Sequence, residues 1–117
     1  MVKQPATTEY LETALRAFGQ RQAVIANNIA NINTPDFRRG AVDFQKRLAE
    51  AIASGRPIDP QRFAAEIIQP MTTPVDSSGN DVNLEMEIGE MIKNSGAYKT
   101  YLRLLGKLYR QMELAMQ

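Results

Sequence analysis

The stretch LEMEIGEMIKNSGAYKTYLRLLGKLYRQMELAM, residues 84–116, decides the fold class of this 117-residue chain. Its apolar residues recur at alternating steps of four and three. They are Leu84, Ile88, Met91, Tyr98, Leu102, Leu105, Tyr109, Met112 and Met116, with Ser95 at the one interrupted position. This heptad spacing is typical of a helix packed lengthwise on another helix. Asn83 is its predicted N-cap.

A second apolar line follows the first by one residue, so the apolar face is wider than a single partner helix needs. Its members are Ala97, Tyr101, Leu104 and Leu108. Exposed apolar area of this extent is unusual in a soluble monomer. We therefore expect the face to meet other subunits as well as the chain's own helix. The predicted interface set is Ala97, Tyr98, Tyr101, Leu102, Leu104, Leu105 and Leu108.

The N-terminal part of the chain carries a matching helical pattern. Its stripe consists of Leu11, Leu15, Phe18, Gln22, Ile25, Ile29 and Ile32. Pro35 disfavours helical geometry at Thr34, which predicts that the helix ends near Asn33. Beside the stripe runs a line of small residues that would let another backbone come close, namely Gly19, Ala23, Ala26 and Ala30.

The middle of the chain is rich in helix breakers. A short amphipathic helix is predicted around Phe44, Leu48 and Ala51. Residues 63–70 suit either a short strand or a helical turn, and residues 71–81 are predicted to form a loop. The chain thus divides into an N-terminal helix (1–34), a linker with a short helix and loop (35–82) and a C-terminal helix (83–117). We expect a mainly all-α fold: an antiparallel, coiled-coil-like hairpin of two long helices, joined by a short helix and an irregular, partly disordered middle.

The composition excludes several functions. The chain has no Cys, no His and a net charge of +1, so the usual zinc ligands, thiol nucleophiles and imidazole bases are missing. We expect no cofactor and no metal. Four basic residues at 38, 39, 46 and 47 alternate with acidic ones, so no nucleic-acid partner is expected. Residues 1–10 lack the apolar core of a secretory signal, and no stretch is long enough to insert into a membrane.

Asparagines are concentrated where the first helix is predicted to end, in Ala26-Asn27-Asn28-Ile29-Ala30-Asn31-Ile32-Asn33-Thr34-Pro35. Asn is a poor helix former, because its amide competes for backbone hydrogen bonds. Asn27 and Asn31 lie four residues apart on one face, with Asn28 one position round. Their amides could bridge to a facing backbone or to another chain. The alternative is a frayed polar helix end with Asn33 as its cap.

This ten-residue segment closely resembles the signature of the axial proteins of the bacterial flagellum, the rod and hook subunits. Residues 78–105 are similar to the closing helix of the same family. Asp36 stands where the family usually has Gly, and Asp tolerates unusual backbone angles better than most residues. The linker is too short for the β domains that distal-rod and hook proteins insert. The resemblance therefore favours a proximal-rod subunit, with Ala26, Asn27, Asn28, Ile29, Ala30, Asn31, Thr34 and Pro35 in subunit packing.

The resemblance implies a non-enzymatic building block of a shaft that crosses the periplasm and transmits torque from the membrane ring to the hook. The implied partners are further copies, other rod subunits, an adaptor protein of the membrane ring and the gate of the flagellar type III export apparatus. Phe44 and Leu48 resemble the short apolar element that such subunits present to this gate, although they could equally pack on the chain's own helices. The implied route of export needs no cleaved signal peptide.

Three other interpretations were considered. One is that the chain is a different proximal-rod subunit of the same family from the one that its sequence most resembles. A second is a soluble helical adaptor that docks one partner helix and stops growing. A third is an enzyme using the carboxylates of Asp76, Asp81, Glu85 or Glu87, but charges in loops and first helical turns are ordinarily solvated or capping.

Overall fold

The computed structural model describes residues 5–63 and 65–116; residues 1–4 and 117, at the outer ends of the two predicted terminal segments, lie outside the described part. In chain order the elements are α1 (Pro5–Ala30), β1 (Ala41–Asp43), α2 (Gln45–Ser54), β2 (Glu66–Ile68) and α3 (Leu84–Ala115). The molecule is elongated, with extents of 62 × 24 × 19 Å. The predicted mainly helical fold is confirmed.

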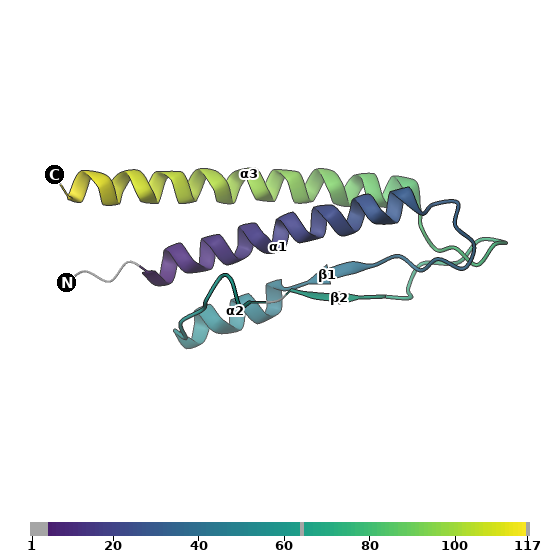
Figure 1. Ribbon diagram of the computed structural model, residues 1–117, viewed down its shortest axis with the longest axis horizontal. Coiled ribbons are helices and arrows are strands. Elements are labelled where there is room, and N and C mark those ends of the chain that lie inside the picture. Colours follow the sequence, from purple (N-terminus) through teal and green to yellow (C-terminus); the bar gives the residue numbers. More distant parts are fainter. Residues whose placement is uncertain (1–4, 64, 117) are drawn as a thin grey trace.

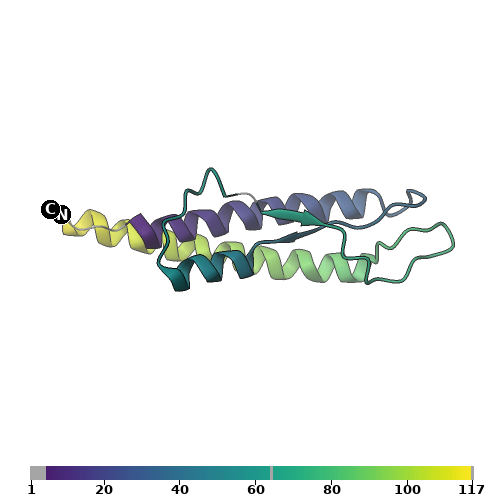
Figure 2. The same ribbon diagram turned by 90° about the horizontal axis from the view of Figure 1, so that it is seen from below.

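The elements form three layers with α1 in the centre (Figure 1). α3 runs antiparallel along one side of α1, and α2 lies on the other side together with the two strands. α1 begins and α3 ends near one end of the molecule, while the loops that follow α1 and precede α3 meet at the opposite end. Figure 2, seen from below, shows α2 and the strands lying along the helical pair.

The helix ends follow from local chemistry. α1 begins at Pro5, whose fixed φ suits the first helical position. After Ala30 the chain continues in hydrogen-bonded turns, with the Ile32 amide donating to Ile29 O at 3.2 Å. Asn83 caps α3 as predicted, because its Oδ1 accepts from the Met86 amide at 2.9 Å.

The middle segment is more regular than predicted. β1 and β2 pair antiparallel, with Val42 opposite Ile67, so residues 63–70 contain the strand that was one of the two options. β1 was not predicted, since three residues are too few to show a strand's alternation. Val42 is buried against the core, whereas all three residues of β2 are exposed. α2 ends at Gly55, which adopts a left-handed φ of 69°.

Aromatic side chains join the three layers. Phe18 of α1 meets Phe44, just before α2, edge to face with ring centroids 5.1 Å apart. On its other side it meets Tyr101 of α3 at 5.0 Å. Leu48 and Val42 complete this core with small residues of α1. The core therefore depends on α1, which contributes to both of its interfaces.

The face of α3 that meets α1 differs from the predicted one. Met91, Leu105 and Met112 are buried or half-buried, but the other predicted seam residues are partly or largely exposed: Leu84, Ile88, Tyr98, Leu102, Tyr109 and Met116. The inward positions are taken by residues one step earlier: Glu87, Asn94, Tyr101 and Leu108. The pattern was misjudged because Glu87 and Asn94 are polar, and both have hydrogen-bond partners across the seam.

The predicted stripe of α1 lies inward, with Phe18 and Ile25 buried and the other members half-buried. A further buried set, Thr13, Ala14, Ala17 and Asn28, belongs to the same helix and was not predicted as a face. The line of small residues is exposed at all four positions, Gly19, Ala23, Ala26 and Ala30. A Cβ added at Gly19 would meet no atom within 4 Å. Within the described chain, no second backbone uses this line.

Candidate functional site

The Asn-rich segment is tied to the rest of the chain by Asn28, which has no exposed surface. Its Nδ2 donates to Gly40 O at 2.9 Å and its Oδ1 accepts from the Gly40 amide at 2.9 Å. The same Nδ2 donates to Glu87 Oε1 of α3 at 3.0 Å. One amide thus connects α1, the start of β1 and α3. Asn28 lies in the last turn of α1, near the loops that follow α1 and precede α3.

Two buried carboxylates and one arginine extend this contact. Arg39 Nε donates to Glu87 Oε2 at 2.5 Å, and the Arg39 backbone amide donates to Asp81 Oδ1 at 2.6 Å. Asp81 Oδ2 lies 3.8 Å from Arg38 Nη1. Glu87 and Asp81 are 0% and 1% exposed. We call Asn28, Arg39, Asp81 and Glu87 the hairpin-end cluster.

The loops on either side of the cluster are held together by backbone bonds. The Asp36 amide donates to Ser78 O at 2.9 Å, and the Asp81 amide donates to Phe37 O at 3.3 Å. Asp36 has a left-handed φ of 60°, so it adopts the backbone conformation that Gly favours. Asn80, also buried, donates from Nδ2 to Asn31 O and Thr34 O, both at 2.8 Å.

A tight turn around Asp76 precedes the cluster in the chain. Asp76 Oδ1 accepts from the Ser78 side chain and from the Ser78 and Asn80 amides. These bonds, that of the Ser78 hydroxyl first, lower the pKa of Asp76 below its ordinary value. The contribution of this carboxylate to the folded state is therefore present above the ordinary pKa of Asp and is lost as the pH falls through the lowered value.

The other residues of the predicted motif lie mostly at the surface. Asn31 Nδ2 donates to Asn27 O of its own helix at 2.9 Å, and Thr34 donates to Asn31 Oδ1. Across the fold, the amide that reaches a facing backbone is Asn28 rather than Asn27 or Asn31. Ile29 and Asn31 are half-buried, and the remaining members are exposed: Ala26, Asn27, Ala30, Thr34 and Pro35.

The predicted interface of α3 divides into inward and outward residues. Leu105 is buried, and Ala97, Tyr101 and Leu108 are half-buried on the α1 side. The outward members are Tyr98, Leu102 and Leu104, with exposed fractions of 38%, 49% and 48%. Leu102 was predicted in the seam with α1, and it lies outside that seam.

The two residues predicted to act in export are buried. Phe44 is 1% exposed and Leu48 is 7% exposed, and both belong to the core shared with Phe18. The folded chain therefore uses them for packing. The export interpretation requires a chain in which this core is open.

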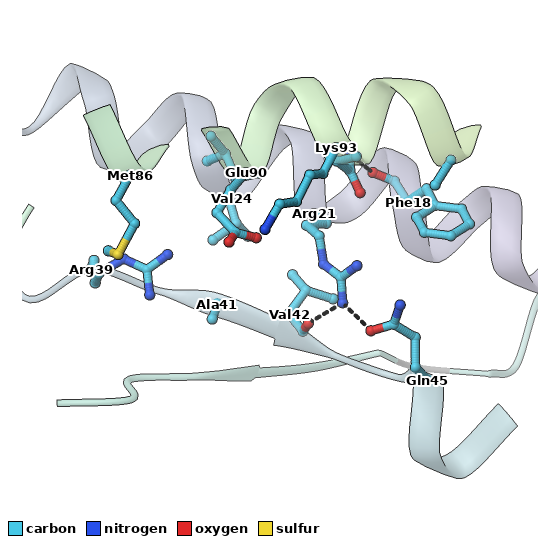
Figure 3. Close-up of a pocket in the computed structure, with 13 residues that line it drawn as sticks. Phe18, Arg21, Val24, Arg39, Ala41, Val42, Gln45, Met86, Glu90 and Lys93 are labelled. Atoms are coloured by element: carbon cyan, nitrogen blue, oxygen red, sulfur yellow. Dashed lines mark hydrogen bonds between the residues drawn. The ribbon is translucent and has the colours of Figure 1, made fainter. Parts of the chain in front are cut away.

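A pocket of about 420 Å³ lies between α3 and β1 with α1 as its floor (Figure 3). Arg21 points across it from α1 and donates to Val42 O at 2.8 Å and Gln45 Oε1 at 3.1 Å. Burial lowers the pKa of Arg21 from its ordinary value, while Glu90 and Asp43 raise it. The guanidinium also lies 4.6 Å from the Phe44 ring. These contacts hold β1 and α2 against α1.

Several residues of the rival interpretations have structural partners. Asp81 and Glu87 belong to the hairpin-end cluster, which corrects the expectation that they are solvated or capping. Arg39 pairs with Glu87, and Arg47 lies 4.6 Å from the Phe63 ring. Among the described residues, no three acidic side chains are grouped so as to hold a metal ion. In the same part of the chain, no helix is long and apolar enough to cross a bilayer.

Sequence reasoning missed Arg39, Asn80 and Asn94 as structural residues. Asn94 Nδ2 donates to Phe18 O and to Gln22 Oε1, both at 2.8 Å. The available signal for Asn94 was its position seven residues after Glu87 on the same helical face. Gln22, the one polar residue in the α1 stripe, was a matching signal, because polar residues facing one another across a seam can hydrogen-bond.

Comparisons with known proteins identify relatives of this chain. A family model described as "Flagella basal body rod protein" matches residues 10–38, which span most of α1 and the turn up to Arg38. The flagellar basal body rod protein FlgB of Bacillus subtilis (strain 168) is 33% identical over 111 residues, covering 86% of each chain. FlgB of Escherichia coli (strain K12) is 26% identical over 132 residues, covering 98% of this chain and 96% of its own.

FlgB of Proteus mirabilis (strain HI4320) is likewise similar, with 26% identity over 128 residues and coverage of 95% of this chain and 93% of its own. The chain belongs to the flagellar basal body rod protein family. It is a structural protein of the basal body and not an enzyme. The buried Asn28 lies inside the segment that the family model matches.

Neighbouring asparagines provide a matched test of the hairpin-end cluster. Asn28→Ala should lower the free energy of unfolding by about 2–3 kcal/mol, because it removes the partner of both Gly40 backbone groups and one of the donors to Glu87. Asn27→Ala removes the same group from an exposed position, so the free energy of unfolding should stay within about 0.5 kcal/mol of the parent value. Urea denaturation of the two variants measures both. Equal effects would contradict the assignment.

Proposed function

We propose that this protein is a subunit of the proximal rod, which self-assembles with other rod proteins into the shaft that transmits torque from the membrane ring to the hook. The observation that best supports this proposal is a line of exposed residues along α3 that includes Ile88 and Leu102. Ile88 and Leu102 of this line are 43% and 49% exposed. Other residues of α3 pack on α1, so these two are not needed for that contact. Large exposed apolar surface of this kind is typical of a protein interface.

The exposed line of small residues on α1 supports the same proposal. Gly19, Ala23, Ala26 and Ala30 offer a surface on which a neighbouring helix could come close without displacing a side chain. Asn27 and Asn31 lie next to this line and would supply hydrogen bonds to the neighbour. A subunit with such separate surfaces makes head-to-tail contacts, and these generate a filament when they do not close into a ring.

The soluble-adaptor alternative would use one of these surfaces for one partner. Similarity over most of the chain to several FlgB proteins favours the rod.

We further propose that the rod lies across the periplasm, with the adaptor protein of the membrane ring as the partner at its base.

Leu102→Asp tests assembly apart from folding. Because Leu102 is outward, the purified variant should keep its helicity and lose less than about 1 kcal/mol of unfolding free energy. In a strain lacking the chromosomal copy, it should nevertheless fail to restore swimming and be absent from purified basal bodies. Thr100→Asp, which adds the same charge at an exposed position of α3, should restore both. Normal swimming with Leu102→Asp would refute an assembly role for this line.

We also propose that the protein leaves the cytoplasm unfolded through the flagellar type III export apparatus, without a cleaved signal peptide. Phe44 and Leu48 would then meet the export gate before they enter the core. If the segment forms a helical turn at the gate, their four-residue spacing would put both side chains on one face, suited to neighbouring apolar pockets. Contact with the export gate would come first and packing in the core second, and both would use the same two side chains.

Phe44→Ala and Phe18→Ala separate export from packing. Both remove a buried aromatic ring from one core, and each should destabilise the fold by about 3–5 kcal/mol. If Phe44 is read by the gate, only Phe44→Ala should accumulate in the cytoplasm, while Phe18→Ala is secreted. Measuring the two proteins in culture supernatants and cell pellets gives the comparison. Equal secretion of both would assign Phe44 to the folded structure alone.

A further inference from the structure

α3 carries two alternative lines with which it could face α1. The outer line is Ile88, Ser95, Leu102 and Tyr109. The inner line is Glu87, Asn94, Tyr101 and Leu108. Each inner residue precedes an outer one by a single position, so the two lines are separated by about 100° around the helix. Met91, Leu105 and Met112 border both.

Apolar burial alone would favour the outer line, because it begins with Ile88 where the inner line begins with Glu87, while each line also has one Tyr and one Leu. The structure has the reverse arrangement. Glu87 is 0% exposed and Asn94 is 4% exposed, whereas Ile88 and Leu102 remain nearly half exposed. Something other than apolar area determines the rotation of α3.

The inner line is held by polar bonds that reach α1 from two separate heights of α3. Near its start, Glu87 accepts from Asn28 of α1 and from Arg39. Near its middle, Asn94 donates to Phe18 O and Gln22 Oε1 of α1. A rotation by one residue would break both sets. The buried Arg39 side chain would lose the carboxylate of Glu87, and Asn28 would keep only its bonds to Gly40. Polar groups of this kind are known to fix register in coiled coils.

We infer that Glu87 and Asn94 select the face of α3 that packs on α1, and so keep Ile88 and Leu102 of the outer line at the surface. They are positioning residues of the hairpin. That the surface line is kept for a neighbouring subunit rests on the proposed function. The selection of the face does not, and it is testable in the isolated chain.

Crosslinking can report the rotation of α3, because the chain has no native Cys. Tyr109 donates to Glu12 Oε1 at 2.5 Å, so these positions are adjacent. A Glu12→Cys and Tyr109→Cys pair therefore reports the observed face. If α3 turned by one residue, Arg110 would take the place of Tyr109, so a Glu12→Cys and Arg110→Cys pair reports the alternative. A short bismaleimide, used on dilute purified full chain, joins each pair.

Three backgrounds are compared. In the parent, the first pair should crosslink at least about tenfold faster than the second. Combining Arg39→Met, Glu87→Ala and Asn94→Ala removes the polar bonds without stranding a charge, and should bring the ratio to about one or below. The matched control combines Glu85→Ala, Thr100→Ala and Arg103→Ala, three exposed residues of α3, and should keep the parent ratio.

A parent-like ratio in the triple variant, with helicity retained by circular dichroism, would overturn the inference. If that variant does not fold, Asn94→Ala alone decides the question, since it leaves the Arg39 and Glu87 pair intact. It should lower the ratio by about threefold or more, and an unchanged ratio would overturn the inference. Neither result depends on rod assembly, so failure here is distinct from failure of the proposed function.

Discussion

The contact among Asn28, Arg39 and Glu87 is the constraint on which the rest of the structure depends. It joins α1, the start of β1 and α3 at the end of the molecule where the loops meet. A hairpin of two long helices has little interior, so apolar packing alone specifies its register weakly. Glu87, with its two partners, fixes both the height and the rotation at which α3 begins.

This arrangement sacrifices some stability but specifies one hairpin geometry. Burying an ion pair often contributes little net stability, whereas removing one partner of such a pair costs about 3–5 kcal/mol. Leaving Ile88 and Leu102 half exposed forgoes part of the roughly 1.5–3 kcal/mol that full burial of each would contribute. The chain therefore stabilises one specific hairpin and retains apolar surface on its outside. That division suits a subunit of a basal body rod, whose surface must bind neighbours.

Sequence reasoning succeeded where the signal was local. Asn83 marked the start of α3, whereas Pro35 predicted a helix end near Asn33, three residues beyond the end of α1 at Ala30. It failed where a polar residue acts across the fold. Nothing in a heptad pattern distinguishes a buried Glu87 from an exposed Glu85 two residues earlier, because the difference lies in Arg39 and Asn28, which are distant in sequence. For the same reason the sequence did not show which of the three asparagines reaches a facing backbone, because the partner of Asn28, Gly40, has no side chain to indicate it.

The most direct test of this account is a double-mutant cycle on Arg39 and Glu87, measured as the free energy of urea unfolding. Glu87→Gln and Arg39→Met should each destabilise the chain by about 3 kcal/mol or more, since each leaves a buried charge unpaired. The double variant should cost clearly less than the sum, with a coupling energy of about 2 kcal/mol or greater. Additivity of the two substitutions to within about 0.5 kcal/mol would contradict the claim that this pair holds the hairpin together.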